Sequence, residues 1–179
     1  MLRGLRNRMK RENEPRVLIL GLDNAGKTTI LNTLGVAEEH PVEAPEGPTQ
    51  GFNVMDVNRN GKRAKLCDLG GQRALREFWE DYYANTDCIM YVVDSSDQRR
   101  LHEAHEAFVD VVKGVPSVPV LVFANKQDLA TAKDPQTVAE VLELNEYRDR
   151  RWHIQGCSAK SGAGLEEGVA WVFEACNVR

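Results

Sequence analysis

A short apolar run at residues 16–20 (RVLIL) passes without a spacer into GLDNAGKT, residues 21–28. The run has the length of a strand, and the pattern that follows at 27–34 predicts a helix. Because the connecting loop has a glycine at each end, backbone N–H groups and the helix amino terminus can surround phosphate oxygens. This strand–loop–helix unit therefore predicts an α/β fold that holds a di- or triphosphate.

The rest of the chain repeats the alternation of strand-length and helical patterns, which is typical of a mostly parallel sheet with helices on both faces. Strands are predicted at 16–20, 53–57, 62–67, 88–94, 119–125 and 152–157, and helices at 27–34, 74–83, 99–113, 135–142 and 165–176. Asn60-Gly61 favours a tight hairpin, so the second and third strands should be antiparallel. A chain of 179 residues suits one such domain, expected at 16–179 after a basic arm at 1–15.

Charge is unevenly distributed along the chain. The net charge is −4, but residues 1–16 contribute +4 and the remainder −8, a balance that argues against a nucleic-acid partner. The longest apolar runs, 88–93 and 118–124, are shorter than the roughly 18 residues that cross a bilayer. The four cysteines lack C-x-x-C spacing, which predicts reduced thiols in a cytoplasmic protein.

Individual residues of the GLDNAGKT loop have predicted roles. Lys27 would place its charge against the β- and γ-phosphates, and the Thr28 hydroxyl would bind Mg²⁺. Asp23 would disfavour the γ-phosphate unless a hydrogen bond held its carboxylate elsewhere. Phosphate contacts are expected from Gly21, Asp23, Asn24, Ala25, Gly26, Lys27, Thr28 and Thr29.

A base-reading segment is predicted at Asn125-Lys126-Gln127-Asp128, which follows an apolar strand. The Asp128 carboxylate can accept hydrogen bonds from guanine N1–H and the 2-amino group, and adenine offers neither donor. A site that pairs with such donors rejects a base that lacks them on the order of 10⁴-fold. The later segment Cys157-Ser158-Ala159 supplies a second loop, in which the Ala159 N–H could meet guanine O6.

A sensor of the third phosphate is predicted at Asp68-Leu69-Gly70-Gly71-Gln72. Asp68 can hold Mg²⁺ through water, the Gly71 N–H can meet the γ-phosphate, and Gln72 can orient an attacking water. Thr49, in a proline-rich insert, is the natural second hydroxyl ligand for Mg²⁺. That insert would then act as a switch loop, ordered by GTP and released by hydrolysis.

The motifs GLDNAGKT, GPTQGFN, DLGGQ, NKQD and CSA resemble, in order and spacing, those of the ADP-ribosylation factor family of small GTPases. The resemblance covers about residues 14–177 and implies a Ras-like P-loop GTPase fold, a monomer that binds GTP or GDP with Mg²⁺. It also implies an exchange factor, a GTPase-activating protein and an effector that recognises the GTP form. It is strongest to a branch known for GTP-dependent release of lipidated cargo from β-sandwich carriers, in the cytoplasm, at membranes or towards cilia and flagella.

Two positions depart from the family pattern. Cys67 stands where the family usually has tryptophan, which there joins aromatic residues matched by Phe52 and Tyr82 in a patch read by effectors. The insert before Thr49 is also longer than usual. The sequence therefore leaves the effector, the regulators and the membrane unidentified.

Hydrolysis is expected to be slow. No arginine occurs from residue 17 to 58, so the switch loop lacks an internal arginine finger, and an activator would supply a cation worth 10³ to 10⁵ in rate. The expected catalytic set is Gln72, with Lys27, Thr49 and Gly71. Two alternatives are a GTP-binding module with negligible hydrolysis and a nucleotide kinase, which needs an arginine-rich lid that the sequence does not offer.

The arm MLRGLRNRMKRE places Leu2, Leu5 and Met9 on one helical face, with basic residues around it. A solvated tail is one interpretation. The resemblance implies another, an amphipathic helix that packs against the body with GDP and is released with GTP. Its membrane contact would be weak, at about 1 kcal/mol for each basic residue.

Overall fold

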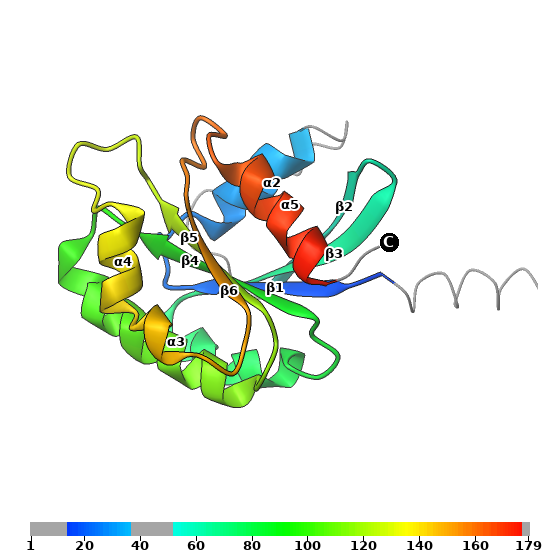
Figure 1. Cartoon of the computed structure of the whole chain (residues 1–179), viewed down its shortest axis with the longest axis horizontal. Coiled ribbons are helices and arrows are strands. Elements are labelled where there is room, and N and C mark those ends of the chain that lie inside the picture. The colour runs from blue at the N-terminus through cyan, green and yellow to red at the C-terminus, as the bar shows by residue number, and fades with distance from the viewer. Residues whose placement is uncertain (1–13, 37–51, 177–179) are drawn as a thin grey trace, which may run out of the picture.

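The computed structural model describes residues 14–36 and 52–176, which form a sheet with helices on both faces (Figure 1). The sheet has six strands in the order β2-β3-β1-β4-β5-β6. Their bounds are β1 (Arg16–Gly21), β2 (Phe52–Arg59), β3 (Lys62–Leu69), β4 (Cys88–Asp94), β5 (Val120–Asn125) and β6 (Trp152–Gly156). The predicted six-stranded α/β sheet is confirmed.

Strand pairing follows the predicted topology. β3, β1, β4, β5 and β6 pair in parallel, and β2 pairs with β3 in antiparallel register. The turn between β2 and β3 has positive φ at both central residues, 54° at Asn60 and 78° at Gly61. Two-residue hairpins favour this conformation because its twist matches that of the strands, so the predicted hairpin is confirmed.

The helices cover the sheet in two layers. α2 (Lys27–Val36) and α5 (Leu165–Ala175) lie on one face, and α3 (Leu101–Gly114) and α4 (Pro135–Val141) lie on the other (Figure 1). Short 3-10 helices occur at η1 (Arg73–Tyr82), η2 (Gln98–Arg100) and η3 (Leu144–Glu146).

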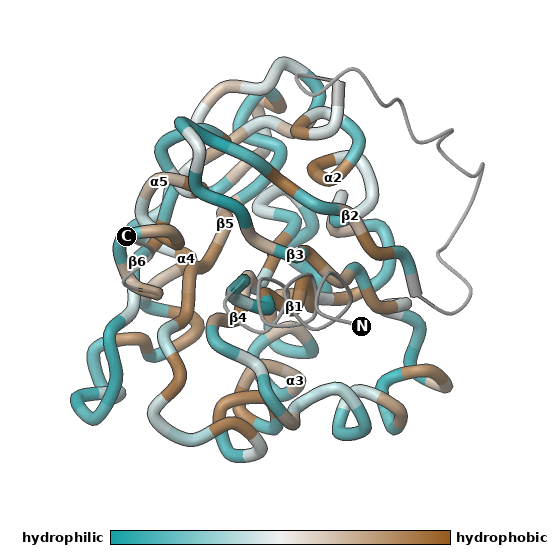
Figure 2. The backbone as a smooth tube through the Cα atoms, turned by 90° about the vertical axis from the view of Figure 1, so that its right-hand side faces the viewer, coloured by the Kyte–Doolittle hydropathy of each residue, from teal (hydrophilic) through white to brown (hydrophobic). Residues whose placement is uncertain are grey.

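The core consists of two apolar layers separated by the sheet. On β1, Val17 and Ile19 face the layer under α2 and α5, whereas Leu18 and Leu20 face the layer under α3. A parallel strand covered on both faces is apolar throughout, which explains the run RVLIL. Figure 2 shows the hydrophobic tube gathered at the centre of the molecule and the outer loops mostly hydrophilic.

Several predicted elements need correction. The helix expected at 74–83 is the 3-10 helix η1, whose turns close through i to i+3 bonds such as Leu75 N–H to the Gln72 carbonyl (2.8 Å). The helix expected at 99–113 is divided into η2 and α3. The remaining helix and strand ends coincide with the predicted ones or differ by at most two residues, because end residues lack part of the regular hydrogen bonding.

Three sequence predictions lie partly or wholly outside the described residues: the amphipathic arm, the proline-rich insert and its Thr49. The division into an arm and a domain stays a prediction. Among the described helices, none combines the length and the apolar character that a membrane span requires.

Candidate nucleotide-binding site

The phosphate loop, residues 21–28, leaves β1 and enters α2 in a conformation that requires its two glycines. A Cβ at Gly21 would collide with the Val92 carbonyl oxygen of β4, and a Cβ at Gly26 would collide with the Asn125 side chain. Both residues also have positive φ, 145° and 100°. The spacing of the two glycines therefore reflects the close approach of β4 and β5 to the loop.

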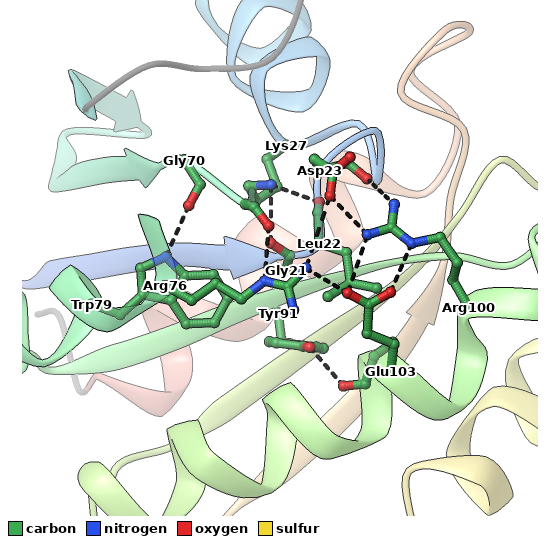
Figure 3. Close-up of polar contacts among 12 residues, drawn as sticks. Gly21, Leu22, Asp23, Lys27, Gly70, Arg76, Trp79, Tyr91, Arg100 and Glu103 are labelled. Atoms are coloured by element: carbon green, nitrogen blue, oxygen red, sulfur yellow. Dashed lines mark hydrogen bonds and ion pairs between the residues drawn. The ribbon is translucent and has the colours of Figure 1, made fainter. Parts of the chain in front are cut away.

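Lys27 lies beneath this loop. Its side chain is buried, and its Nζ donates to the carbonyl oxygens of Gly21 (3.1 Å) and Leu22 (2.8 Å) (Figure 3). Burial lowers the pKa of Lys27 to about 8, and the nearby carboxylates of Asp68 and Asp23 oppose that shift. The phosphate loop thus encloses an amine that phosphate oxygens would help to keep charged.

The two predicted magnesium ligands in the described chain lie side by side. The Thr28 Oγ1 on α2 donates to Asp68 Oδ2 on β3 at 2.6 Å. A hydroxyl and a carboxylate are oxygen donors of the kind that Mg²⁺ prefers. The described residues contain no cluster of three or more His, Cys, Asp or Glu that could hold a metal. A magnesium ion here would therefore also need oxygens from phosphate and water.

Asn125 joins the phosphate loop to the second base-side loop. Its Nδ2 donates to the Ala25 carbonyl (2.8 Å), and its Oδ1 accepts from the Ala159 N–H (2.9 Å). The residue is only 1% exposed. Asn125 is therefore a clamp between the two loops, a role that is more structural than the sequence predicted.

The base-side residues are partly oriented by one another. Ser158 Oγ donates to Asp128 Oδ1 (2.8 Å), and Lys126 Nζ lies 2.8 Å from Asp94 Oδ2. The Ala159 N–H, expected to meet guanine O6, donates to Asn125, so a base would have to share this donor. Base recognition by these residues stays a prediction.

The segment predicted to sense the third phosphate reaches the phosphate loop. A Cβ at Gly71 would collide with the backbone of Leu22 and Asp23, so only glycine permits this approach. Gln72 is half-buried and immediately precedes η1. Two η1 side chains hold the segment, because Arg76 Nε donates to the Gly71 carbonyl (2.9 Å) and Trp79 Nε1 to the Gly70 carbonyl (3.0 Å).

A group of charged residues around Asp23 was missed by the sequence analysis. Arg100 donates through Nη2 to Asp23 Oδ1 (2.7 Å) and through Nη1 to the Asp23 carbonyl (3.1 Å) (Figure 3). Asp23 was expected to disfavour the γ-phosphate unless a hydrogen bond held its carboxylate elsewhere, and Arg100 makes such a hydrogen bond. The two residues are 77 positions apart, and no local pattern could have paired them.

The loops that carry these residues follow β1, β3, β5 and β6, and so gather at the carboxyl edge of the sheet. Open α/β sheets bind their ligands at this edge. The fold and these loops define a P-loop GTPase with a Ras-like sheet.

A sequence model of the ADP-ribosylation factor family matches residues 1–176, and the chain belongs to this family of GTP-hydrolysing small GTPases. ADP-ribosylation factor-like protein 3 from Chlamydomonas reinhardtii is 44% identical over 176 residues, which is 97% of this chain and 96% of the relative. The protein of the same name from Caenorhabditis elegans is 44% identical over 162 residues, 89% of this chain and 86% of the relative.

A solved structure is also similar to this chain. The Arl6 BBS3 small GTPase from Trypanosoma brucei, with the bound nucleotide analogue GppNp, has a TM-score of 0.81 and 33% sequence identity. The match covers 92% of this chain and 98% of that chain.

Proposed function

We propose that this chain is a GTP-dependent switch that binds GTP or GDP with Mg²⁺, and hydrolyses GTP slowly without an activator. The observation that carries the proposal is the clamp formed by Asn125. Because one buried side chain bonds both Ala25 and Ala159, the phosphate and base sites are parts of a single arrangement. A ligand that fills both is a nucleotide, and Asp128 selects guanine.

The proposed phosphate chemistry is divided among three segments. Lys27 would hold the β- and γ-phosphates, and Gln72 would orient the attacking water. Mg²⁺ would be held by Thr28, by Thr49 and, through water, by Asp68. Mg²⁺, when bound, would neutralise charge on the phosphate oxygens. The Gly71 N–H would bind the γ-phosphate, because the Gly71 backbone lies against Leu22 and Asp23 of the phosphate loop.

Slow intrinsic hydrolysis is supported by the arginines nearest the loop. Arg76 and Arg100 both donate to Glu103, at 2.8 and 2.9 Å, and Arg100 also donates to Asp23. Guanidinium groups engaged in this way do not neutralise the charge that spreads over the γ-phosphate oxygens. An activating protein would supply that cation.

The finer role that we propose is release of lipidated cargo from a β-sandwich carrier, in the cytoplasm or in traffic at membranes or towards cilia. Its support is the resemblance, together with the two relatives named ADP-ribosylation factor-like protein 3. An effector would meet exposed apolar side chains near the sensor segment, Val54 (46% exposed) and Phe78 (51%). Cys67 is buried and lies opposite Val54 in the hairpin, so it does not replace the exposed face of the family's tryptophan.

Binding and turnover measurements test the proposal. Wild-type chain should bind fluorescent GDP and GTP in Mg²⁺, ATP should not compete, and an activator from the family should accelerate phosphate release. Gln72→Leu should keep both affinities within about twofold and lose the stimulated rate, on the order of 10³-fold. Equal stimulated rates in the two proteins would remove Gln72 from the mechanism, and no stimulation of wild type would favour a non-hydrolysing module.

A further inference from the structure

Asp23 belongs to a group of four charged side chains, each from a different element of the fold. We name Asp23, Arg76, Arg100 and Glu103 the ionic quartet (Figure 3). Asp23 comes from the phosphate loop, Arg76 from η1, Arg100 from the end of η2 and Glu103 from the first turn of α3. Two positive and two negative groups are therefore held together across these segments.

The contacts within the quartet are short and share partners. Arg100 lies 2.7 Å from the Asp23 carboxylate and 2.9 Å from that of Glu103. Arg76 lies 2.8 Å from Glu103 and 3.8 Å from Asp23. The four side chains are only 15–32% exposed, so water screens the group less than it would screen a surface pair.

Both acids of the quartet are ionised at neutral pH. Hydrogen bonds from Arg100 and Arg76 lower the pKa of Glu103 to about 2. The hydrogen bond from Arg100 lowers the pKa of Asp23, against the effect of its own burial. Asp23 therefore carries a negative charge inside a loop that is built to surround phosphate, and Arg100 is its nearest cation.

This charge would act differently on the two nucleotides. GTP differs from GDP by one phosphoryl group, which adds negative charge at the end of the phosphate chain. A carboxylate left without its cation repels that charge by an amount that depends on separation and local dielectric constant. Loss of the Arg100 contact should therefore weaken GTP binding more than GDP binding.

The quartet also reaches the sensor segment. The Nε of Arg76 donates to the Gly71 carbonyl (2.9 Å), while Nη2 of the same guanidinium donates to Glu103. Gly71, whose N–H is proposed to meet the γ-phosphate, is thus connected by its own carbonyl, through Arg76 and Glu103, to Arg100. A change at Arg100 would disturb both Asp23 and Gly71.

We propose that Arg100 is a positioning residue for nucleotide selection, which holds the Asp23 carboxylate away from the γ-phosphate and, through Glu103 and Arg76, fixes the place of Gly71. This inference rests on the proposed function, that the site binds GTP and GDP. A purely structural Arg100 would instead support both nucleotides equally.

A double-mutant cycle tests this inference. Dissociation constants for GDP and for a non-hydrolysable GTP analogue are measured for wild type, Arg100→Gln, Asp23→Asn and the double variant. Arg100→Gln should weaken the analogue about tenfold relative to GDP, as expected for one like charge at several ångströms that water partly screens. Asp23→Asn, introduced into Arg100→Gln, should recover most of the lost ratio of the two affinities, and the part that is not recovered measures the route through Glu103 and Arg76 to Gly71.

Arg99→Gln is the matched control, because Arg99 is the exposed neighbour on η2 and loses the same charge. Its affinity ratio should equal that of wild type. If Arg100→Gln does not fold, Arg100→Lys takes its place. The ratio of the affinities for the analogue and GDP should then fall about threefold, because a lysine makes fewer of the contacts.

Two results would overturn the inference: equal loss of both nucleotides in the Arg100 variant, or no recovery of the ratio in the double variant. Failure of the proposed function would look different, since wild type would then bind neither guanine nucleotide.

Discussion

The Asp128 carboxylate is oriented by Ser158, whose hydroxyl donates to it at 2.8 Å. Asp128→Asn presents an amide where guanine needs two acceptors, and we expect GTP affinity to fall on the order of 10⁴-fold. Xanthosine triphosphate, which has an oxygen at the 2-position, should then bind better than GTP. Competition against a fluorescent nucleotide measures both effects.

Asp149→Asn serves as the control for Asp128, because it removes an exposed carboxylate outside the proposed site. It should leave the preference for GTP unchanged. If Asp128→Asn keeps wild-type GTP affinity, Asp128 does not read the base.

The effect of pH on the stability of the fold can be tested at a single residue, Glu103. Its pKa is about 2 in the folded chain, against an ordinary value of 4.5, so its stabilising effect is complete above pH 4.5 and is lost as the pH falls towards 2. Glu103→Gln should therefore lower the thermal midpoint by a few degrees at pH 7 and by less at pH 3. A difference that is the same at both pH values would show that the Glu103 charge does not stabilise the fold.

The residues of the site differ in how far the sequence could predict them. Lys27, Thr28 and Asp68 stand at fixed positions in short motifs, because the phosphate chain and its metal dictate the local spacing. The contact between Arg100 and Asp23 could not be predicted, because it depends on how α3 packs on the sheet. The clamp role of Asn125 was missed for the same reason: its bonds reach Ala25 and Ala159, 100 and 34 residues away.

Among the elements, the β2–β3 hairpin is held at its far end by Arg59. This side chain contacts both Glu166 oxygens of α5 (2.9 and 3.0 Å) and donates to the Leu34 carbonyl of α2 (3.2 Å). Glu166 is 59% exposed, so the ion pair itself should contribute less than about 1 kcal/mol. The Leu34 carbonyl lies in the last turn of α2, where carbonyl oxygens have no partner within the helix. Arg59 supplies the donor that this carbonyl needs.

Two substitutions separate these contributions of Arg59. Arg59→Ala should lower the free energy of unfolding by about 1–2 kcal/mol, because it removes the donor to Leu34 as well as the ion pair. Glu166→Ala should cost less than about 1 kcal/mol. Urea titrations of both variants measure the difference, and equal losses would show that the Leu34 contact contributes nothing.

Element type was predictable where periodicity decides it, and less so where side chains replace the regular backbone pattern. Within residues 14–36 and 52–176, the six strands and four α-helices occur near their predicted positions. η1 was expected to be an α-helix, because its apolar spacing is compatible with one. Bonds from Arg76 and Trp79 back to the carbonyls of Gly71 and Gly70 accompany its tighter 3-10 form, and periodicity does not reveal them.

Across the whole molecule, the residues that end the basic arm lie on the hairpin. The Pro15 carbonyl accepts from the Lys65 N–H (2.9 Å), and Glu14 lies 3.7 Å from Arg63. If the arm leaves the body when GTP replaces GDP, as the resemblance implies, the chain next to this attachment must move. The arm and the γ-phosphate are then coupled, and the coupling is reciprocal.

Deletion of residues 1–15 should accordingly raise GTP affinity relative to GDP by about 5- to 150-fold, the usual range of such coupling. Trp79 is buried and bonded to the Gly70 carbonyl, so its fluorescence should report nucleotide exchange in both chains. Replacing the arm with an unrelated polar sequence of equal length controls for the new terminus. An unchanged affinity ratio would make the arm a passive tail.

The Asn125 clamp has a consequence for timing. Because its own side chain joins Ala25 to Ala159, the placement of the two loops does not wait for a nucleotide to order them. A nucleotide then meets a prepared surface, and association needs little conformational search. Departure should be the slower event, since many rigid contacts must break together. The lifetime of the GDP-bound state would therefore be decided by whichever outside protein deforms the phosphate loop.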